Sequence, residues 1–407
     1  MIKKITTLKK KIKKNKEPVK FATFVILIVS GFLLGANRDL LPDLVSKIRG
    51  QKLSSHEVVT AKEIDRILSD ENAILINVHT PYEGEIAGTD LFIDYNMMKA
   101  GKDKLPADKN AKIVLYCRTG RMSEEALITL KGMGYRNVSH LDGGMEAWDK
   151  AGYKLLDLSN LPQEVLPEEG FELPISWGRI GPDLIRLGVI DREKFEKAVR
   201  MDDTQVEILT KGSDANIEIN SQNSQFVVDI LWALGLAQKS KVYDEGPMGK
   251  EQKAQAGNFA STGGWTLARG DAMNYYNKFS LVPLTPAQHD KVMGIAENVY
   301  RPCCGNHTAF PDCNHGMAAL AAIELMVSKG LSDEEIYANV LKLNSFWFPQ
   351  NYLTTATYFA RQDIAWDDVD PKVVLGVEYS SGQGAQAIFQ KVGPLPYGGT
   401  GGGSCGA

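Results

Sequence analysis

The sequence predicts an α/β domain with a parallel sheet, placed between an N-terminal membrane helix and a mainly α-helical C-terminal domain. Three observations predict this order. Residues 21–36 form an apolar run without a charge, residues 56–156 alternate short buried strands with helical segments, and residues 177–393 carry mainly helical periodicity. A chain of 407 residues has ample material for two or three domains, and its net charge of −4 gives no indication of nucleic-acid binding.

The first 20 residues form a basic tail, with nine lysines against the single acidic residue Glu17. Residues 21–36 are just short of the length that crosses a bilayer at about 1.5 Å per residue. Because lysines stay on the cytoplasmic side, we expect a single-pass anchor with a cytoplasmic N-terminus and extracytoplasmic domains. A cleaved signal peptide is the alternative, but cleavage after Ala36 would place Leu34 where a small residue is needed. Residues 37–55 then form a short stalk.

The domain over residues 56–156 begins with a helix and continues with buried strands. Thr60 and Glu63 have the spacing of a capping box at a helix start. Residues 73–78, 112–116 and 137–141 are short apolar runs that we expect to be strands. Strands that alternate with helices along the chain predict a parallel sheet.

Cys117 lies where the strand over residues 112–116 turns into a helix. The first backbone N–H groups of that helix favour negative charge on the sulfur, and Arg118 and Arg121 add to this field. We therefore expect a partly ionised thiol near neutral pH. The amides of the loop surround a small hollow that suits a persulfide or an oxyanion. The expected substrate-binding residues are Arg118, Thr119, Gly120, Arg121, Met122 and Ser123.

Residues 56–156 resemble the rhodanese family of sulfurtransferases. The resemblance depends on three motifs in the right order, namely Ile76 to Glu83, Tyr116 to Ser123 and Leu141 to Trp148. It implies a rhodanese-like parallel sheet and a catalytic Cys117 that takes a sulfane sulfur from a donor, holds it as a persulfide and passes it to a thiol acceptor. It also implies that Arg118 binds small anionic donors and that sulfur transfer needs no cofactor. The length of the Cys117 loop resembles the sulfur-handling members rather than their longer-looped phosphatase relatives.

Two positions depart from the pattern of the family. Family members often carry arginine where this chain has Met122, and here Arg121 comes one residue earlier, so its guanidinium is expected to point outward to substrate or solvent. Family members also often read Asp-Val-Arg where this chain has Asn77, Val78 and His79. That change removes an ion pair, whose hydrogen bonds a neutral Asn/His pair is expected to replace. An inactive rhodanese that serves as a binding module is the alternative to the enzyme.

Prolines and acidic residues mark an expected linker over residues 157–176, and a mainly helical domain over residues 177–393 follows it. Helix starts are indicated at Asp191, Thr285 and Ser332 by capping residues. Within this domain only residues 217–219 alternate like a strand. No family is indicated for it.

This second domain contains a cluster of cysteines and histidines within residues 303–315, namely Cys303, Cys304, His307, Cys313 and His315. Three interpretations are open. The cysteines with His315 or His307 bind zinc, copper or an iron–sulfur centre; or Cys304 and Cys313 form a disulfide; or one thiol accepts sulfur from Cys117. Because Cys313 starts a helix, its thiol is expected to have a low pKa.

Residues 394–407 form a glycine-rich tail with Cys405 near its tip, which we expect to act as a mobile thiol that shuttles sulfur or closes a disulfide, or else to be incidental. The sequence thus predicts a membrane-anchored sulfurtransferase that acts through a Cys117 persulfide. The alternative is a metal-binding or thiol-redox protein in which the rhodanese domain supplies sulfur or is not catalytic. The oligomeric state is not indicated.

Overall fold

The computed structural model describes residues 57–68, 73–393 and 395. The basic tail, the expected membrane anchor at 21–36, the stalk and the glycine-rich tail with Cys405 lie outside the described residues. Within the described ranges, no helix has both the length and the apolar character that a membrane crossing requires.

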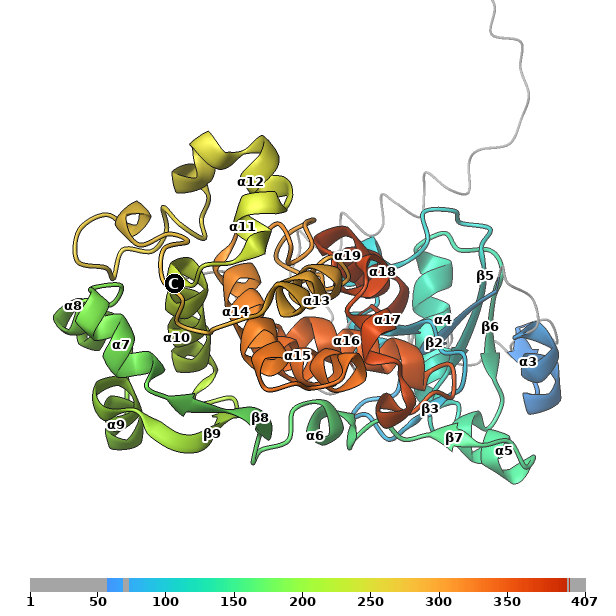
Figure 1. Ribbon diagram of the computed structural model, residues 1–407. Helices are drawn as coiled ribbons and strands as arrows, with labels where there is room; N and C mark the ends of the chain where they lie inside the picture. The colour runs from blue at the N-terminus through green and yellow to red at the C-terminus, as the bar shows by residue number, and fades with distance from the viewer. Residues whose placement is uncertain (1–56, 69–72, 394, 396–407) are drawn as a thin grey trace, which may run out of the picture. The chain divides into compact units, whose positions relative to one another are not determined.

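A five-stranded parallel sheet confirms the predicted α/β domain, and its strand order is β1-β6-β5-β2-β4 (Figure 1). Its strands are β1 (Val58–Val59), β2 (Ala73–Asn77), β4 (Leu91–Phe92), β5 (Lys112–Tyr116) and β6 (Val138–Leu141). The three strands expected from the apolar runs are the adjacent β2, β5 and β6. Their apolar character follows from burial on both faces of the sheet.

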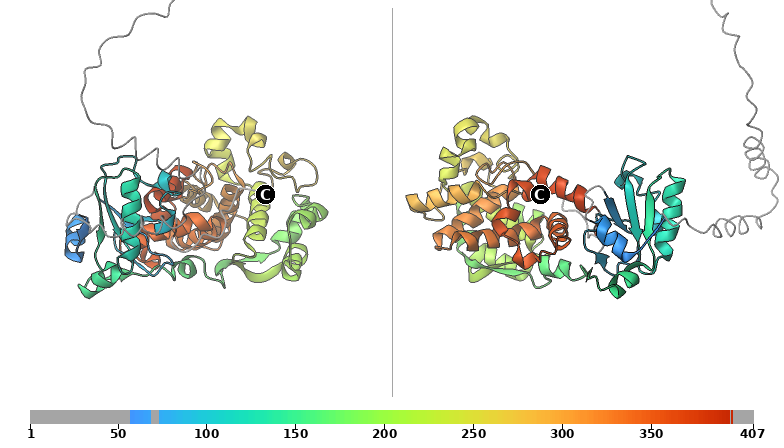
Figure 2. Two further views of the ribbon diagram at one scale, coloured as in Figure 1. Left: turned by 180° about the vertical axis from the view of Figure 1, so that it is seen from behind. Right: turned by 90° about the vertical axis from the view of Figure 1, so that its right-hand side faces the viewer.

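Helices α3 (Ala61–Ile67), α4 (Arg121–Gly132) and α5 (Gly144–Lys150) pack on the sheet from both sides (Figure 2). Val114 and Tyr116 share one core cluster with α3 and α5, whereas the alternate residues of β5 face α4. Thr60 forms the predicted capping box at the start of α3. Smaller elements complete this part: the antiparallel pair β3 (Glu85–Ile86) and β7 (Leu155–Leu156), and 3₁₀ turns at Tyr95–Met97 and Lys102–Lys104.

The residues expected to form a linker contain regular structure. Helix α6 (Leu161–Val165) is followed by β8 (Phe171–Gly178), which pairs antiparallel with β9 (Ser213–Ile219). Leu173, Ile175 and Trp177 of β8 are buried, so alternate side chains of this strand face the core. The register shifts between Glu172 and Ser176, where Pro174 has no N–H to donate. A proline at this interruption is compatible with a strand. The prolines that indicated a linker therefore do not prevent β8 from forming.

The rest of the described chain is mainly helical, as predicted. Its helices are α7 (Ile180–Leu187), α8 (Arg192–Ala198), α9 (Asp203–Lys211), α10 (Ser224–Ala237), α11 (Lys241–Glu245), α12 (Pro247–Glu251), α13 (Pro286–Ala296), α14 (Asn314–Ser328), α15 (Asp333–Trp347), α16 (Pro349–Ala360), α17 (Pro371–Val374), α18 (Val377–Ser380) and α19 (Gly382–Val392), with 3₁₀ turns at Lys253–Asn258, Ala272–Asn274 and Trp366–Asp368. Asp191, Thr285 and Ser332 cap α8, α13 and α15 as expected.

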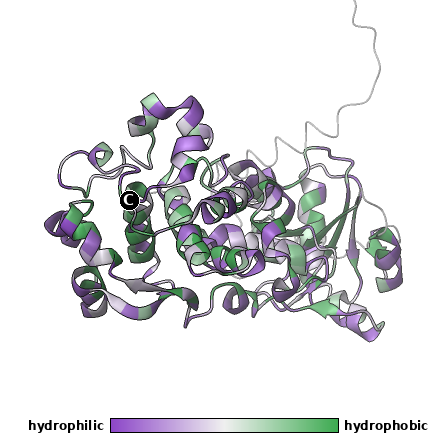
Figure 3. Ribbon diagram, viewed as in Figure 1, coloured by the Kyte–Doolittle hydropathy of each residue, from purple (hydrophilic) through white to green (hydrophobic). Residues whose placement is uncertain are grey.

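Helices α10 and α14 lie at the centre of this helical region and are buried along most of their length. Figure 3 shows α10 as a largely hydrophobic helix. The two helices pack closely because Gly235 of α10 has no side chain. A Cβ atom at this position would collide with Met317 of α14. The first turn of α14 therefore has a fixed position, and this turn carries Cys313 and His315.

Candidate functional site

Cys117 is buried at the end of β5, and its sulfur accepts a hydrogen bond from the backbone of the next turn. The Gly120 N–H donates to the Cys117 Sγ over 3.1 Å. Gly120 has a φ of 96°, a left-handed conformation that glycine adopts without strain, and it stands directly before α4. This tight turn thus directs a backbone donor at the sulfur.

Ser123 and His140 form a chain of contacts that leads from the Cys117 sulfur into the domain. The Ser123 hydroxyl lies 3.6 Å from the Cys117 Sγ and 3.2 Å from Nδ1 of His140. His140 lies on β6 and is buried, and burial lowers the pKa of its imidazole below the usual value, against the opposing charges of Glu124 and Asp142. A neutral imidazole near pH 7 can exchange a proton with the thiol through the hydroxyl.

The first turn of α5 holds the backbone of the Cys117 loop. The N–H groups of Met145 and Glu146 donate to the carbonyl oxygens of Cys117 and Arg118 over 2.8 and 3.0 Å. The glycine-rich start of α5 thus fixes the two residues at the beginning of the loop, which explains why two of the three motifs occur together in space.

Both arginines of the loop are paired with carboxylates. Arg118 Nε donates to Glu146 Oε1 over 3.0 Å and its Nη1 donates to Glu83 Oε2 over 2.9 Å, and these contacts raise the pKa of the guanidinium, that with Glu146 most. Arg121 donates to Glu125 over 2.8 Å and is mostly exposed. Of the other loop residues, Thr119 is exposed and Met122 is half-buried.

Asn77 and His79 lie at the end of β2, and the Asn77 side chain forms two hydrogen bonds there. Asn77 Nδ2 donates to the Gly84 carbonyl oxygen, and Asn77 Oδ1 accepts from the His79 N–H, each over 3.0 Å. The His79 imidazole lies 3.2 Å from Glu83, the same carboxylate that contacts Arg118. The first motif is thereby linked to the loop through Glu83.

The second candidate site brings together three sulfurs. Those of Cys303, Cys304 and Cys313 all lie within 4.8 Å of one another, and Cys303 Sγ is 3.4 Å from Cys313 Sγ. All three are free cysteines and half-buried. Cys313 is the N-cap of α14, and the Gly316 N–H lies 3.4 Å from its sulfur. Hydrogen bonds from the other two thiols, together with Arg301, hold the pKa of Cys313 well below its usual range.

A fully buried arginine supports these sulfurs. Arg301 Nε donates to Cys313 Sγ over 3.0 Å, and its Nη2 donates to Asp312 Oδ1 over 2.6 Å. The guanidinium also donates to the carbonyl oxygens of Asn306 and Phe310. A side chain at Gly316 would overlap the guanidinium, so glycine is required there.

Neither histidine of this segment belongs to the three-sulfur group within the described residues. The His315 ring packs against Trp347 and Phe348, its Nδ1 has no partner in the described part of the chain, and burial lowers its pKa to about 4. His307 packs against Tyr300. Cys117 is likewise not a member of the group.

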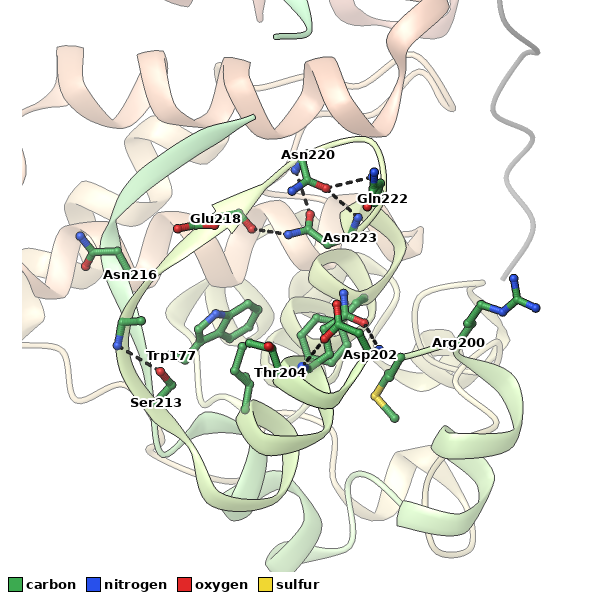
Figure 4. Close-up of a pocket in the computed structure, with 15 residues that line it drawn as sticks. Trp177, Arg200, Asp202, Thr204, Ser213, Asn216, Glu218, Asn220, Gln222 and Asn223 are labelled. Carbon is green, nitrogen blue, oxygen red and sulfur yellow. Dashed lines mark hydrogen bonds between the residues drawn. The ribbon is translucent and has the colours of Figure 1, made fainter. Parts of the chain in front are cut away.

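A cavity of ≈ 510 Å³ lies between β9, α9 and the start of α10, and its lining includes several amide side chains beside Trp177, Arg200 and Phe226 (Figure 4). Most of these amides already stabilise the backbone. Asn220 accepts from the N–H groups of Gln222 and Asn223, Asn223 donates to the Glu218 carbonyl oxygen, and Asp202 caps α9. Asn220, Asn223 and Asp202 therefore have structural partners.

Two residues of these sites, His140 and Arg301, are not among those that the sequence predicts. His140 is a histidine within the apolar run 137–141, next to the strand that ends at Cys117. Arg301 lies two residues before Cys303, and a cation this close to a pair of cysteines was the available signal.

Part of the chain is similar to known proteins. Residues 60–151 match the family described as a rhodanese-like domain. The probable adenylyltransferase/sulfurtransferase MoeZ of Mycobacterium tuberculosis is 38% identical over 97 residues, which are 23% of this chain and 24% of that protein. A sulfurtransferase of Allochromatium vinosum is 28% identical over 104 residues, which are 25% of this chain and 94% of that protein.

One solved structure is also similar to part of the chain. The rhodanese-related protein of Thermoplasma volcanium is 21% identical, with 25% of this chain and 97% of that chain covered and a TM-score of 0.22. The chain spans only about a quarter of the length of MoeZ. The matched range contains all three motifs around Cys117 and ends before β8. Residues 60–151 are thus a rhodanese-like domain with sulfurtransferase relatives, whereas the helical region that follows is not assigned to a family.

Proposed function

We propose that this protein is a sulfurtransferase that carries a sulfane sulfur as a persulfide on Cys117 and delivers it to a thiol acceptor. The observation that carries the proposal is the hydrogen bond from the Gly120 N–H to the Cys117 sulfur at a strand-to-helix turn. The rhodanese-like match and the sulfurtransferase relatives support the same chemistry.

The reaction has two steps and needs no external oxidant. The Cys117 thiolate attacks the outer sulfur of a donor persulfide or thiosulfate, a new S–S bond forms, and the remainder of the donor leaves as a thiolate or sulfite. An acceptor thiolate then attacks the outer sulfur of the Cys117 persulfide, so that the Cys117 thiolate is regenerated and the acceptor becomes a persulfide. The backbone N–H of Gly120 stabilises negative charge at the sulfur in both steps.

His140 prepares the nucleophile in this proposal. The thiol proton of Cys117 passes to Ser123 while the Ser123 hydroxyl proton passes to His140, over the contacts of 3.6 and 3.2 Å. Burial keeps the imidazole neutral at neutral pH and therefore able to accept that proton. His140 acts through Ser123 as the final proton acceptor, without a contact to the Cys117 sulfur in this proposal.

We also propose that residues 21–36 anchor the protein in the cytoplasmic membrane with the domains outside. The support is the uncharged run behind nine lysines. Cells are fractionated and spheroplasts are treated with protease. Digestion of the rhodanese-like domain only in opened spheroplasts, or recovery of the protein without detergent, would contradict this placement.

The sulfur-transfer proposal is tested on the purified, reduced full chain. The protein is incubated with glutathione persulfide or thiosulfate, and mass spectrometry then measures the peptide that contains Cys117. We expect one added sulfur atom on that peptide, which is lost when glutathione is added as acceptor. Cys117→Ser is expected to abolish both events while circular dichroism stays that of the wild type. An unmodified Cys117, or turnover retained in Cys117→Ser, would contradict the proposal.

A further inference from the structure

We propose that Cys303, Cys304 and Cys313 bind one thiophilic metal ion, Zn²⁺ or Cu⁺, through three thiolates. The site goes beyond the sulfur-transfer chemistry of Cys117, because it lies in the helical region and uses none of the loop residues. Its sulfurs come from two places, the turn after Arg301 and the N-cap of α14, and all lie within 4.8 Å of one another.

The spacing of the sulfurs fits a single ion. Zinc–sulfur bonds of about 2.3 Å in a tetrahedral arrangement place two sulfur ligands about 3.8 Å apart. The Cys303–Cys313 separation of 3.4 Å is slightly below this value, and no two of the three sulfurs are more than 4.8 Å apart. A disulfide would use two sulfurs and leave the third unexplained, whereas one ion uses all three. Thiolates without histidine are soft ligands, which select d¹⁰ ions over magnesium or calcium.

The polar groups around the sulfurs also suit a bound cation. Arg301 lies within hydrogen-bond distance of both Cys313 Sγ and the Asp312 carboxylate. A bound cation displaces the protons of the thiols that become its ligands, so its binding releases protons to solvent. Arg301 donates to Cys313 Sγ, and outer-shell donors of this kind orient and stabilise metal-bound ligands.

The site leaves one coordination position for a small ligand. No histidine nitrogen joins the group among the described residues, and Asp312 is engaged by Arg301 and Asn306. The sulfurs are half-buried rather than enclosed. Three protein ligands with an open position are typical of reactive zinc sites, whereas structural zinc is closed by four. The fourth position is therefore available to water or to a thiolate.

Metal binding is measured on the full chain, purified with a reductant and stripped with a chelator. Zn²⁺ is titrated against a chromophoric competitor, Cu⁺ is titrated in a parallel arm, and Co²⁺ serves as a spectroscopic probe of thiolate ligation. We expect one ion per chain, three thiols protected from alkylation, and thiolate-to-cobalt charge-transfer bands. Tighter binding of Zn²⁺ or of Cu⁺ identifies the ion, and either result supports the site.

Single serine variants locate the ligands. Cys303→Ser, Cys304→Ser and Cys313→Ser are each expected to lose the charge-transfer bands of the three-thiolate site, and Cys117→Ser is the matched control that keeps them. Because Cys313 also caps α14, Cys304→Ser with an unchanged circular dichroism spectrum is the decisive variant. Arg301→Gln is expected to weaken binding by about 10–100-fold with one ion per chain retained.

Three results would overturn the proposal. These are no stoichiometric binding to the reduced chain, binding that survives Cys304→Ser unchanged, and a Cys303–Cys313 disulfide that forms quantitatively and persists under reductant in the metal-free protein. None of them bears on sulfur loading of Cys117, so this test and the test of sulfur transfer fail independently.

Discussion

Arg361 and Glu85 form a buried ion pair, although 276 positions separate them in the chain. Arg361 Nε donates to Glu85 Oε1 over 2.8 Å, and the two side chains are 7% and 0% exposed. Arg361 follows α16 in the helical region, and Glu85 belongs to β3 of the rhodanese-like domain. The N–H of Ile86, next to Glu85, donates to the Tyr116 hydroxyl, and Tyr116 directly precedes Cys117. The helical region is therefore connected to the strand that positions the nucleophile.

Arg361→Met is expected to destabilise the protein by about 3–5 kcal/mol, because it leaves the Glu85 carboxylate buried without a partner. The double variant Arg361→Met with Glu85→Gln should lose less free energy of unfolding than the sum of the losses in the two single variants. Urea denaturation measures both. The matched control is Lys154→Ala, which removes the exposed pair with Asp363 and should cost less than about 1 kcal/mol. If the two variants lose the same free energy of unfolding, burial does not make the Arg361–Glu85 pair more important than the exposed pair.

His140→Gln is expected to lower the rate of sulfur loading by about 100-fold, because the thiol loses its proton acceptor behind Ser123. In the wild type the rate should fall only when acid protonates His140, below its already lowered pKa. In the variant the rate should rise with pH as solvent takes over the proton. Single-turnover loading across pH 5–9 measures this, with His289→Gln as the histidine control in the helical region. An identical pH profile in both proteins would exclude the relay.

Glu83→Gln is expected to improve kcat/KM for thiosulfate roughly two- to fivefold, because it removes one of the two carboxylates that hold Arg118 at the exposed loop. The improvement should shrink as ionic strength rises, since exposed charges are screened. Steady-state kinetics at low and high salt check both statements. A loss of activity in Glu83→Gln would instead assign Glu83 a positioning role through His79.

Glu324 on α14 is fully buried, and burial raises the pKa of its carboxyl to about 8 although the nearby Ser240 hydroxyl lowers it in part. The folded protein thus keeps this proton while the unfolded chain, with an ordinary pKa near 4.5, loses it. Stability contributed by this residue falls as pH rises from about 4.5 to 8. Glu324→Gln should therefore stabilise the protein by about 3 kcal/mol at pH 7 and little at pH 4.

The measurement for Glu324 is urea denaturation at pH 4, 7 and 8.5, with the exposed Glu251→Gln as control. The same stability difference at all three pH values would contradict a protonated Glu324 in the folded state.

Features with local causes were predictable from the sequence. The strands around Cys117, its tight turn and the helix caps at Thr60, Thr285 and Ser332 each depend on residues within one or two turns. The strand β8 is hard to predict although its apolar residues alternate, because Pro162, Pro167 and Pro174 are also typical of a linker. The ladder accommodates Pro174 at a register shift, which only the pairing with β9 reveals.

The missing parts of the candidate sites were those that depend on distant residues. Glu83 and Glu146 meet at Arg118 from two other motifs, and His140 reaches Ser123 from the neighbouring strand. The sequence indicated that Cys303, Cys304 and Cys313 belong together, but the fully buried position of Arg301 depends on how the loop folds against α14. Burial of a charged residue next to thiols is a tertiary property, and no local pattern encodes it.

Cys313, the N-cap of α14, links the chemistry of a thiol to the stability of a helix that lies in the core. A serine in that position would accept the Gly316 N–H with the same strength under all conditions, whereas the sulfur of Cys313 changes its charge and bonding when it is oxidised, alkylated or ligated. A change there alters the free energy of the helix start by about 1 kcal/mol. The melting temperature of the protein should therefore depend on the chemical state of the Cys313 sulfur. A thermal denaturation curve can detect a change in that state without any substrate.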